Sequence, residues 1–272
     1  MKSATEPSAP PLRLGELRRP LGTQRLGRTI HYLTEVDSTN RYAHDLARQA
    51  AEEGEVVLAE GQTQGRGRMG RSWISPSYLN LYLSVILKPR LPSTQVPQIT
   101  LAAGVAVAET LESFLGLPPK IKWPNDLLVE GKKVAGILAE SWCEADQVRF
   151  VILGIGVNLN YPQEKMPEAI KEIATSTLIL TGKPVDRTAF AVRLIQDLDR
   201  CYGDLVEKGF SSVAKRWEGF FGFRGKKVRA TVADQSIVGK AVGIDSTGAL
   251  ILERDEGERE IIVSGEIIPI ET

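Results

Sequence analysis

The sequence predicts an α+β fold, in which a mixed or mainly antiparallel sheet is flanked by helices and followed by a small all-β domain. The β-favouring runs between residues 55 and 160 are joined by short polar turns such as "EGK" and "CEADQ". Such turns are typical of hairpins and do not leave room for βαβ repetition. Beyond Gly222 the pattern contains only short strand-like runs separated by turn signals, which indicates a small barrel or sandwich.

The length of the chain favours one large domain and one smaller domain, because 272 residues exceed the usual size of a single domain. Residues 1–26 mix Pro, Arg and small polar residues without sustained periodicity, and we expect a poorly ordered N-terminal tail there. Residues 27–221 form the predicted α+β domain, and residues 222–272 form the predicted small β-domain.

The first predicted strand, "TIHYLTEV", ends at "DSTN", whose cap-forming residues precede the amphipathic run "RYAHDLARQAAEE". Ser38, Thr39 and Asn40 are therefore expected at a helix N-terminus. The next strands are "EVVLAE" and "NLYLSVIL", followed by a helix rich in small apolar residues, "QITLAAGVAVAETLESFLG". Further expected strands are "IKWPNDLLV", "KKVAGILAESW" and "VRFVILGIGVNLN", and further expected helices are "MPEAIKEIA", "DRTAFAVRLIQDLDRCYGDLVEKG" and "SSVAKRWEGFF".

The charge of the chain is balanced overall but uneven along the sequence. Lys plus Arg equals Asp plus Glu at 34 each, which argues against a surface dedicated to nucleic acid. Residues 61–108 nevertheless contain no Asp or Glu, and they carry five cations: Arg66, Arg68, Arg71, Lys88 and Arg90. This segment is predicted to attract anions.

Several classes of chemistry are excluded by composition. Cys143 and Cys201 lie far apart and form no C-x-x-C motif, which argues against a disulfide scaffold or a thiolate zinc site. With only His31 and His44 available, histidine-based metal and triad chemistry is not expected. No apolar run reaches the roughly 18 residues that span a bilayer, so we expect a cytoplasmic protein without a membrane partner.

The stretch "EGQTQGRGRMGRSW", Glu60–Trp73, contains the G-x-G-x-x-G spacing of a dinucleotide-binding loop. That motif requires a helix N-terminus immediately after the glycines and an acidic residue about twenty positions further on. Here Pro76 and a β-favouring run follow instead, and the acidic residue is missing. The sequence therefore argues against a Rossmann phosphate loop.

Residues 65–73, "GRGRMGRSW", form a glycine- and arginine-rich segment, the arginine loop. Its glycines permit the backbone to approach a ligand closely, and the guanidinium groups of Arg66, Arg68 and Arg71 match the oxygens of carboxylates and phosphates. Taken alone, the loop is as well explained by a solvated surface loop, and less well by a nucleic-acid arm.

A second polar cluster lies in "KWPNDLLVEGKKVAGILAE", residues 122–140. Pro124 is expected to interrupt the strand and to place Lys122, Asn125 and Asp126 at an irregular kink. Lys133 and Gly136 lie on the returning strand of the predicted hairpin and could come back beside that kink. The alternative is that the lysines face solvent and that "ND" forms a simple turn.

The third stretch is "ILGIGVNLN", residues 152–160, an apolar strand interrupted by glycines. Gly154 and Gly156 weaken a strand unless another group approaches its backbone closely. Asn158 then presents a neutral donor and acceptor. A β-bulge followed by a capping amide is the alternative interpretation.

These motifs together resemble the biotin–protein ligase family. "GRGRMGRSW", "KWPND", "GKKVAGIL" and "GIGVNLN" occur in that order and with similar spacing in those enzymes, and the resemblance covers about residues 27–270. It implies a catalytic domain of the class II synthetase-like fold with a central mixed sheet, followed by an SH3-like domain. The related lipoate ligases share the catalytic fold, but their different glycine-rich motif is not found here.

The resemblance implies an ATP-dependent reaction in two steps. The carboxylate of biotin attacks the α-phosphate of ATP, pyrophosphate leaves, and a lysine of a biotin carboxyl carrier domain then attacks the biotinyl-adenylate. The carrier belongs to a biotin-dependent carboxylase. Joining two anions requires cations that neutralise both and needs no nucleophilic side chain, which agrees with the absence of a Ser-His or Cys-His pair.

The resemblance also implies roles for individual residues. Lys133 is the expected main catalyst, and Arg68 assists it. Asp126 is the expected contact of Mg²⁺, through water, or a residue that orients the incoming lysine, whereas Trp73 and Trp123 are interpreted as packing residues. The implied biotin-binding residues are Ser38, Thr39, Asn40, Gln62, Gly65, Arg66, Gly67, Arg68, Lys133 and Gly136. The implied ATP-binding residues are Arg66, Arg68, Arg71, Lys122, Asn125, Asp126 and Asn158.

Some members of this family carry an N-terminal helix-turn-helix domain and repress biotin genes. Only a short segment precedes "TIHYLTEV" here, so the sequence predicts a ligase that does not bind an operator. The competing hypothesis is a binding or regulatory module without catalysis, whose arginine loop would contact nucleic acid. The sequence leaves open which carboxylase is modified and whether the chain forms a homodimer.

Overall fold

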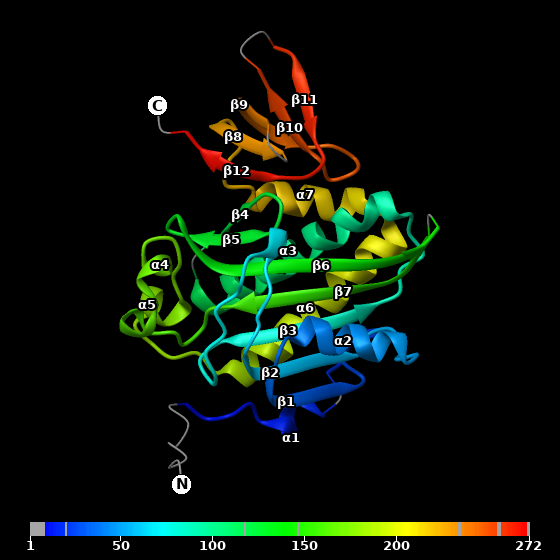
Figure 1. The fold of residues 1–272 in the computed structure, drawn as a ribbon, viewed down its shortest axis with the longest axis vertical. Helices are drawn as coiled ribbons and strands as arrows, with labels where there is room; N and C mark the ends of the chain where they lie inside the picture. The colour runs from blue at the N-terminus through cyan, green and yellow to red at the C-terminus, as the bar shows by residue number, and fades with distance from the viewer. Residues whose placement is uncertain are drawn as a thin grey trace.

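A computed structural model of the chain describes residues 9–19, 21–116, 118–145, 147–232, 235–254 and 257–270. Figure 1 shows a large sheet with helices on both faces and a smaller sheet above its β4–β5 edge. The large sheet has seven strands in this order: β1 (Ile30–Val36), β2 (Val56–Gln62), β3 (Leu81–Leu87), β7 (Gln147–Val157), β6 (Lys132–Glu144), β5 (Asp126–Val129) and β4 (Lys120–Lys122).

The large sheet is mixed, as the sequence predicts. β1 and β2 pair in parallel, and the remaining neighbours pair antiparallel. The parallel pair is joined through α2 (Thr39–Arg48), and the antiparallel strands β5, β6 and β7 follow one another through short turns. The expected α+β fold is therefore confirmed.

The two faces of the sheet contact different helices because side chains alternate along a strand. Val56 and Leu58 of β2 belong to the main core, together with residues of α3 (Val96–Leu115) and α6 (Arg187–Lys208). Val57 of the same strand faces the other way and packs with Ala43 and Ala47 of α2. In Figure 1, α2 accordingly lies in front of the sheet, and α3 and α6 lie behind it.

The long helices end where the sequence places cap residues. α3 ends at Gly116, which has a φ of 64°, a left-handed conformation that glycine adopts without steric cost. α6 begins after Asp186, whose carboxylate accepts hydrogen bonds from the backbone N–H groups of Thr188 and Ala189. The third helix of this layer is α7 (Phe210–Phe220), and its Trp217 is fully buried.

The C-terminal domain is a five-stranded antiparallel sheet that packs against the edge of the larger domain carrying β4 and β5. Trp123 Nε1 donates to the carbonyl of Gly248 at 3.1 Å, and Gln98 Nε2 donates to the carbonyl of Ser246 at 3.2 Å. The strands lie in the order β11 (Arg259–Ile262), β10 (Leu250–Glu253), β9 (Gln235–Ile244), β8 (Lys227–Val232) and β12 (Glu266–Pro269).

Some local expectations were wrong. The run "IKWPNDLLV" forms two strands, β4 and β5, because the turn at residues 123–125 reverses the chain at Pro124. The helix expected at residues 166–174 is only the short α4 (Glu168–Lys171), and α5 (Thr177–Thr181) was not expected. In "MPEAIKEIA", Pro167 directly precedes the helix. Two backbone N–H groups donate to the carbonyl of Ile170, and the resulting turn ends the helix.

The described part of the expected tail packs against the protein, which corrects the prediction of poor order for residues 9–19 and 21–26. This N-terminal segment contains α1 (Leu14–Leu17) and four buried leucines. Asp199 of α6 accepts hydrogen bonds at 2.8 Å from the backbone N–H groups of residues 24, 25 and 26. The buried leucines are Leu12, Leu17, Leu21 and Leu26.

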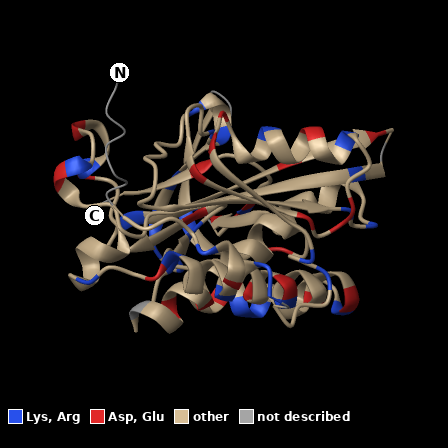
Figure 2. Cartoon of the chain, turned by 90° about the horizontal axis from the view of Figure 1, so that it is seen from below, with Lys and Arg blue, Asp and Glu red and all other residues tan. Residues whose placement is uncertain are grey.

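Basic residues (Lys and Arg) and acidic residues (Asp and Glu) are interspersed along the helices and strands (Figure 2). This distribution agrees with the equal totals of acidic and basic residues. Among the described residues, no helix has the length and apolar character needed to cross a membrane.

We predict that Leu17→Ala lowers the free energy of unfolding by about 2–5 kcal/mol, because the side chain is 1% exposed and truncation leaves a cavity. Arg19→Ala, in the same segment but exposed, should change it by less than about 0.5 kcal/mol. Chemical denaturation of the three proteins measures both changes. An equally small effect of both substitutions would mean that the segment does not contribute to the core.

Candidate active site

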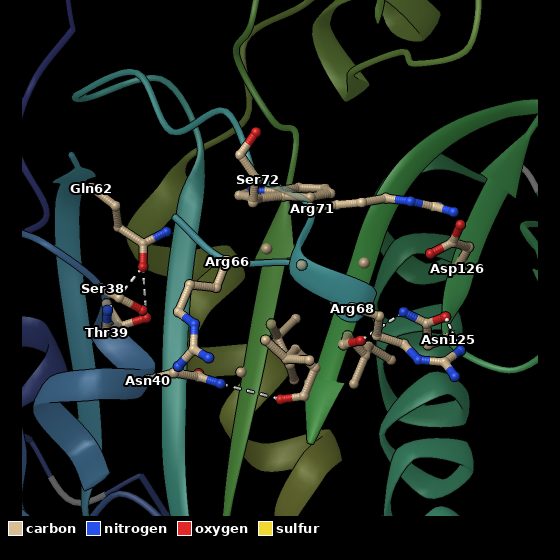
Figure 3. Close-up of a pocket in the computed structure, with 18 of the residues that line it drawn as sticks. Ser38, Thr39, Asn40, Gln62, Arg66, Arg68, Arg71, Ser72, Asn125 and Asp126 are labelled. Atoms are coloured by element: carbon tan, nitrogen blue, oxygen red, sulfur yellow. Dashed lines mark hydrogen bonds between the residues drawn. The ribbon is translucent and has the colours of Figure 1, made fainter. Parts of the chain in front are cut away.

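A cavity opens on the α2 side of the large sheet, beneath the arginine loop (Figure 3). It extends from the N-terminus of α2 across β7 and β6 to the β4–β5 turn. Twelve of the predicted site residues line it: Ser38, Thr39, Asn40, Gln62, Arg66, Gly67, Arg68, Arg71, Asn125, Asp126, Lys133 and Gly136. The other lining residues are Ser72, Trp73, Ile137, Leu138, Gly154, Ile155, Gly156 and Glu266.

The end of the cavity beside α2 is rich in uncharged hydrogen-bonding groups, and the Arg66–Glu140 pair lies next to it. The backbone N–H and the hydroxyl of Thr39 lie 2.9 and 3.1 Å from Gln62 Oε1, and both donate to it. Gln62 Nε2 donates to Ser75 Oγ at 2.9 Å, which fixes the orientation of the amide. Ser84 Oγ lies 2.8 Å from Thr39 Oγ1. This end can therefore present oriented donors and acceptors to a neutral polar ligand group.

Asn40 connects this polar end to the strands below it. Its Nδ2 donates to Glu140 Oε2 at 2.7 Å, and its Oδ1 lies 2.7 Å from Ser84 Oγ. A Cβ atom at Gly154 would lie 2.1 Å from Asn40 Oδ1. The expectation that another group approaches the glycine-containing strand closely is confirmed here, because only glycine leaves room for this carboxamide.

Trp73 lies directly on the sheet at the middle of the cavity. Gly136 of β6 and Gly156 of β7 pair across the two strands, and the indole covers both. A Cβ atom at Gly156 would lie 2.5 Å from the indole ring, and one at Gly136 would lie 3.0 Å from it. The interpretation of Trp73 as a packing residue is incomplete, because its indole lines the cavity and holds the arginine loop against the sheet.

The opposite end of the cavity is charged. Lys133 Nζ lies 2.6 Å from Asp126 Oδ1 and 5.3 Å from the centroid of the Trp73 ring. Asn125 donates from Nδ2 to the carbonyl of Ile137 at 2.8 Å, which ties the β4–β5 turn to β6. The predicted return of the "GKKVAG" strand beside the "KWPND" kink is thus observed. The hairpin of β5 and β6 brings the two motifs together.

Arg68 joins the arginine loop to this charged end and to the C-terminal domain. Its Nη1 donates to Asn125 Oδ1 and to the carbonyl of Gly265, both at 3.2 Å. Burial lowers the pKa of the Arg68 guanidinium from its usual value, and the charges of Glu266 and Asp126 act in the opposite direction. Arginine remains protonated in proteins, so the consequence is a partly dehydrated cation that interacts strongly with an incoming anion.

The other two arginines of the loop pair with carboxylates that sequence analysis missed. Arg71 forms a bidentate pair with Glu266, whose second contact is 2.7 Å long, and Arg66 Nη1 lies 3.0 Å from Glu140 Oε1. Burial alone would raise the pKa of Glu266, but the hydrogen bonds from Arg71 hold it below its usual value. Glu140 lies on the same strand face as Gly136 and Leu138, a spacing that could have revealed it; no comparable signal marks Glu266.

Three predicted residues are not among those that line the cavity. Gly65 shapes the loop through its backbone, since its carbonyl accepts from the N–H of Trp73 at 2.8 Å. Asn158 is buried, accepts from Asn80 Nδ2 and donates to the carbonyl of Thr175 at 3.0 Å. Lys122 pairs in register with Asp126 on the neighbouring strand, and its charge contributes to the lowered pKa of Glu266.

The charged end of the cavity contains few side chains that could bind a metal ion. Across the parts of the chain that the structure describes, no group of three or more His, Cys, Asp and Glu side chains is suited to hold a metal ion. Asp126 and Glu266 nevertheless line the cavity on its cationic side. This donor set fits Mg²⁺ that arrives with a polyphosphate, because such Mg²⁺ keeps several waters and needs only one or two carboxylates.

The cavity thus presents uncharged hydrogen-bonding groups and a cluster of cations over a mixed sheet. The chain matches the biotin/lipoate A/B protein ligase family over residues 32–158, and the biotin protein ligase C-terminal domain over residues 223–268. The 40% identity of this chain to BirA of Bacillus subtilis, over 90% of this chain, shows together with these matches that the chain belongs to the biotin/lipoate A/B protein ligase family.

Similar proteins are found among bacterial ligases. The bifunctional ligase/repressor BirA of Bacillus subtilis is 40% identical over 246 residues, which is 90% of this chain and 76% of that protein. A biotin–[acetyl-CoA-carboxylase] ligase of Mycobacterium tuberculosis is 34% identical over 95% of this chain and 96% of its own length. The structure of biotin protein ligase from Aquifex aeolicus with biotin and ATP superposes with a TM-score of 0.77 at 32% identity, covering 90% of this chain and 100% of that one.

We predict that Gly154→Ala lowers the free energy of unfolding by about 1–3 kcal/mol, because the new methyl group would overlap the carboxamide of Asn40. Gly203→Ala is the control: this glycine lies within α6 with nothing within 4 Å of an added Cβ. The control should stabilise the protein by about 0.5–1 kcal/mol. Denaturant unfolding of both variants measures these values, and a stabilising Gly154→Ala would refute the close packing described here.

Proposed function

We propose that this chain is an ATP-dependent, AMP-forming biotin–protein ligase that transfers biotin to a lysine of a biotin carboxyl carrier domain. The observation that carries the proposal is the convergence of Arg66, Arg68, Arg71 and Lys133 on one cavity that also presents uncharged donors and acceptors beside α2. A ligand with a neutral ring at one end and a carboxylate at the other matches this polarity. The similar A. aeolicus protein binds both biotin and ATP.

The ureido ring of biotin is assigned to the α2 end of the cavity. The ring has two N–H donors and one carbonyl acceptor, and the surrounding groups offer both kinds of partner. Thr39 Oγ1 and Asn40 Oδ1 each retain acceptor capacity, and the hydroxyl of Ser38 can donate. The fixed orientations of Gln62 and Asn40 favour this neutral group, because a misplaced donor or acceptor would leave a buried polar atom without a partner.

The activation step is assigned to the cations beside the β4–β5 turn. A carboxylate oxygen of biotin forms a bond to the α-phosphorus of ATP, the bond from that phosphorus to the bridging oxygen breaks, and pyrophosphate leaves. Lys133 and Arg68 would neutralise the carboxylate and the charge that develops at phosphorus. Lys133 is 31% exposed in its side chain and pairs with Asp126, so it is already held at the site.

ATP is assigned to the region bounded by Arg71, Asn125 and Asp126, with Lys122 nearby. Bound Mg²⁺ would neutralise phosphate charge there, and Asp126 is the residue proposed to hold it, directly or through water. Arg66 is proposed to contact the biotin carboxylate and the α-phosphate from above. For Asn158 the buried hydrogen bonds favour a role in supporting the strand end over contact with ATP.

The transfer step requires an amine and a leaving nucleotide. The lysine Nζ of the carrier forms an amide bond to the acyl carbon of biotinyl-adenylate, the acyl–oxygen bond breaks, and AMP leaves while the amine loses its proton. A carboxylate such as Asp126 can orient that amine at the open end of the cavity. The arginine loop above the adenylate would exclude water, which competes with the lysine for the mixed anhydride.

A nucleic-acid-binding module is supported less well. The three arginines of the loop line one cavity together with Lys133, and their acceptors Glu140, Asn125 and Glu266 lie on other elements of the fold. The overall charge is balanced, so the sequence-independent attraction that supports nucleic-acid binding is weak.

We predict biotin-dependent exchange of labelled pyrophosphate into ATP for the wild type, and a loss of about 10²–10³-fold in Lys133→Ala. Lys132→Ala is the matched control, because Lys132 is the adjacent residue on β6 and pairs with Glu172 at 3.9 Å instead of lining the cavity. Lipoate replaces biotin as the control acid.

Three outcomes decide this proposal. Exchange with biotin alone that is lost in Lys133→Ala and retained in Lys132→Ala supports it. Pyrophosphate exchange with lipoate but not with biotin would mean that lipoate is the acid that the protein activates. No exchange with either acid, from a protein that is folded by circular dichroism, would refute the ligase function and favour the anion-binding alternative.

A further inference from the structure

A buried ion pair lies at the base of the arginine loop, outside the cavity. Glu60 of β2 is 0% exposed, and Arg187, the first residue of α6, is 5% exposed. Arg187 Nη1 lies 2.8 Å from Glu60 Oε2. A buried pair of this kind is favourable only when the remaining donors and acceptors of both groups also have partners.

The N-terminal segment supplies two of those partners. The backbone N–H of Leu12 donates to Glu60 Oε1 at 2.6 Å, and Arg187 Nη2 donates to the carbonyl of Pro10 at 2.7 Å. Tyr32 adds a hydrogen bond from its hydroxyl to Glu60 Oε1 at 2.8 Å. Without residues 10–12, one backbone donor and one backbone acceptor would be withdrawn from an almost fully buried ion pair.

The same ion pair connects both ends of the segment that carries the arginine loop. Glu60 lies two residues before Gln62, which lines the cavity, and its carbonyl accepts from the N–H of Tyr78 at 3.0 Å. Arg187 Nη1 donates to the carbonyl of Asn80, the residue before β3, at 3.2 Å. The ends of the segment are in close contact, since a Cβ at Gly61 would lie 2.3 Å from Ser77 Oγ.

We propose that residues 10–12 are a positioning element for the arginine loop. By completing the hydrogen bonds of the Glu60–Arg187 pair, they hold the two ends of the loop-bearing segment together and thereby keep Gln62 and the loop over the cavity. None of these three residues lines the cavity. The effect on catalysis rests on the proposed function, whereas the effect on the loop does not.

The test compares a variant lacking residues 1–13 with a control lacking residues 1–8, which retains Pro10 and Leu12. Amide hydrogen exchange of residues 62–78 is measured without substrate, and the KM for biotin is measured by pyrophosphate exchange. Both are measured at a temperature at which circular dichroism shows both proteins folded. In the variant lacking residues 1–13 we expect faster amide hydrogen exchange in residues 62–78. We also expect a KM for biotin that is raised about tenfold, with a smaller change in kcat.

Two point variants keep the proposal testable if the truncated chain does not fold. Leu12→Ala removes a side chain that is 3% exposed and loosens the segment, and Tyr32→Phe removes one hydrogen bond to Glu60 without changing the segment. Both variants should speed amide hydrogen exchange of the loop and raise the KM for biotin, by smaller factors than the truncation does. Pro11→Ala, at an exposed position between the two contacts, is the control for Leu12→Ala.

The proposal would be overturned if the variants match their controls both in amide hydrogen exchange of the loop and in the KM for biotin, even if the variants unfold more easily. Such a result would leave the segment with a purely stabilising role. If the wild type shows no biotin-dependent pyrophosphate exchange, the proposed ligase function fails. Amide hydrogen exchange of the loop, measured without substrate, still decides the role of residues 10–12.

Discussion

The structure depends on one electrostatic constraint: the cations gathered at the cavity must be held close together while each retains a local acceptor. Arg66 pairs with Glu140, Arg71 pairs with Glu266, and Lys133 pairs with Asp126. These carboxylates come from β6, the C-terminal domain and β5, so the acceptors of the three cations are distributed over three parts of the fold. A polyanionic ligand that enters the cavity would compete with these carboxylates for the three cations.

A second constraint is steric and concerns the floor of the cavity. Strands β6 and β7 pair at Gly136 and Gly156, and these glycines allow the indole of Trp73 to lie on the sheet, while Gly154 allows the carboxamide of Asn40 to do so. The loop is therefore held both by charge and by close packing. A larger residue at any of these glycines would lift the groups above it and separate the polar end of the cavity from the strands that support it.

Sequence analysis predicted the parts of the fold that have long, regular patterns. α3 was expected from its run of small apolar residues, α6 was expected as a long helix, and the β5–β6 hairpin that brings Asp126 and Lys133 together was expected from its short turn. The role of close approach at Gly154 was also anticipated. In each case, the signal lies within a few neighbouring residues, which is the range over which a sequence pattern is informative.

The features that sequence analysis missed depend on contacts between distant residues. Arg71 and Glu266 are 195 positions apart, and nothing near Glu266 indicates its partner. The leucines of the N-terminal segment show no regular pattern because Leu17 lies in the one-turn helix α1, whereas Leu12, Leu21 and Leu26 pack against the core from irregular backbone, so the segment resembled a tail. The indole of Trp73 was interpreted as packing alone, since its contact with the strand glycines exists only in the folded sheet.

The central claim is that the cations of the cavity join a carboxylate to the α-phosphate of ATP. The most direct test is to incubate the protein with biotin, ATP and Mg²⁺ in the absence of any carrier and to identify the products bound to it by mass spectrometry. Biotinyl-5′-AMP and pyrophosphate, formed in amounts that approach one per chain and absent when biotin is omitted, are the predicted result. Formation of ADP and phosphate, or recovery of unchanged biotin and ATP from a folded protein, would contradict the account.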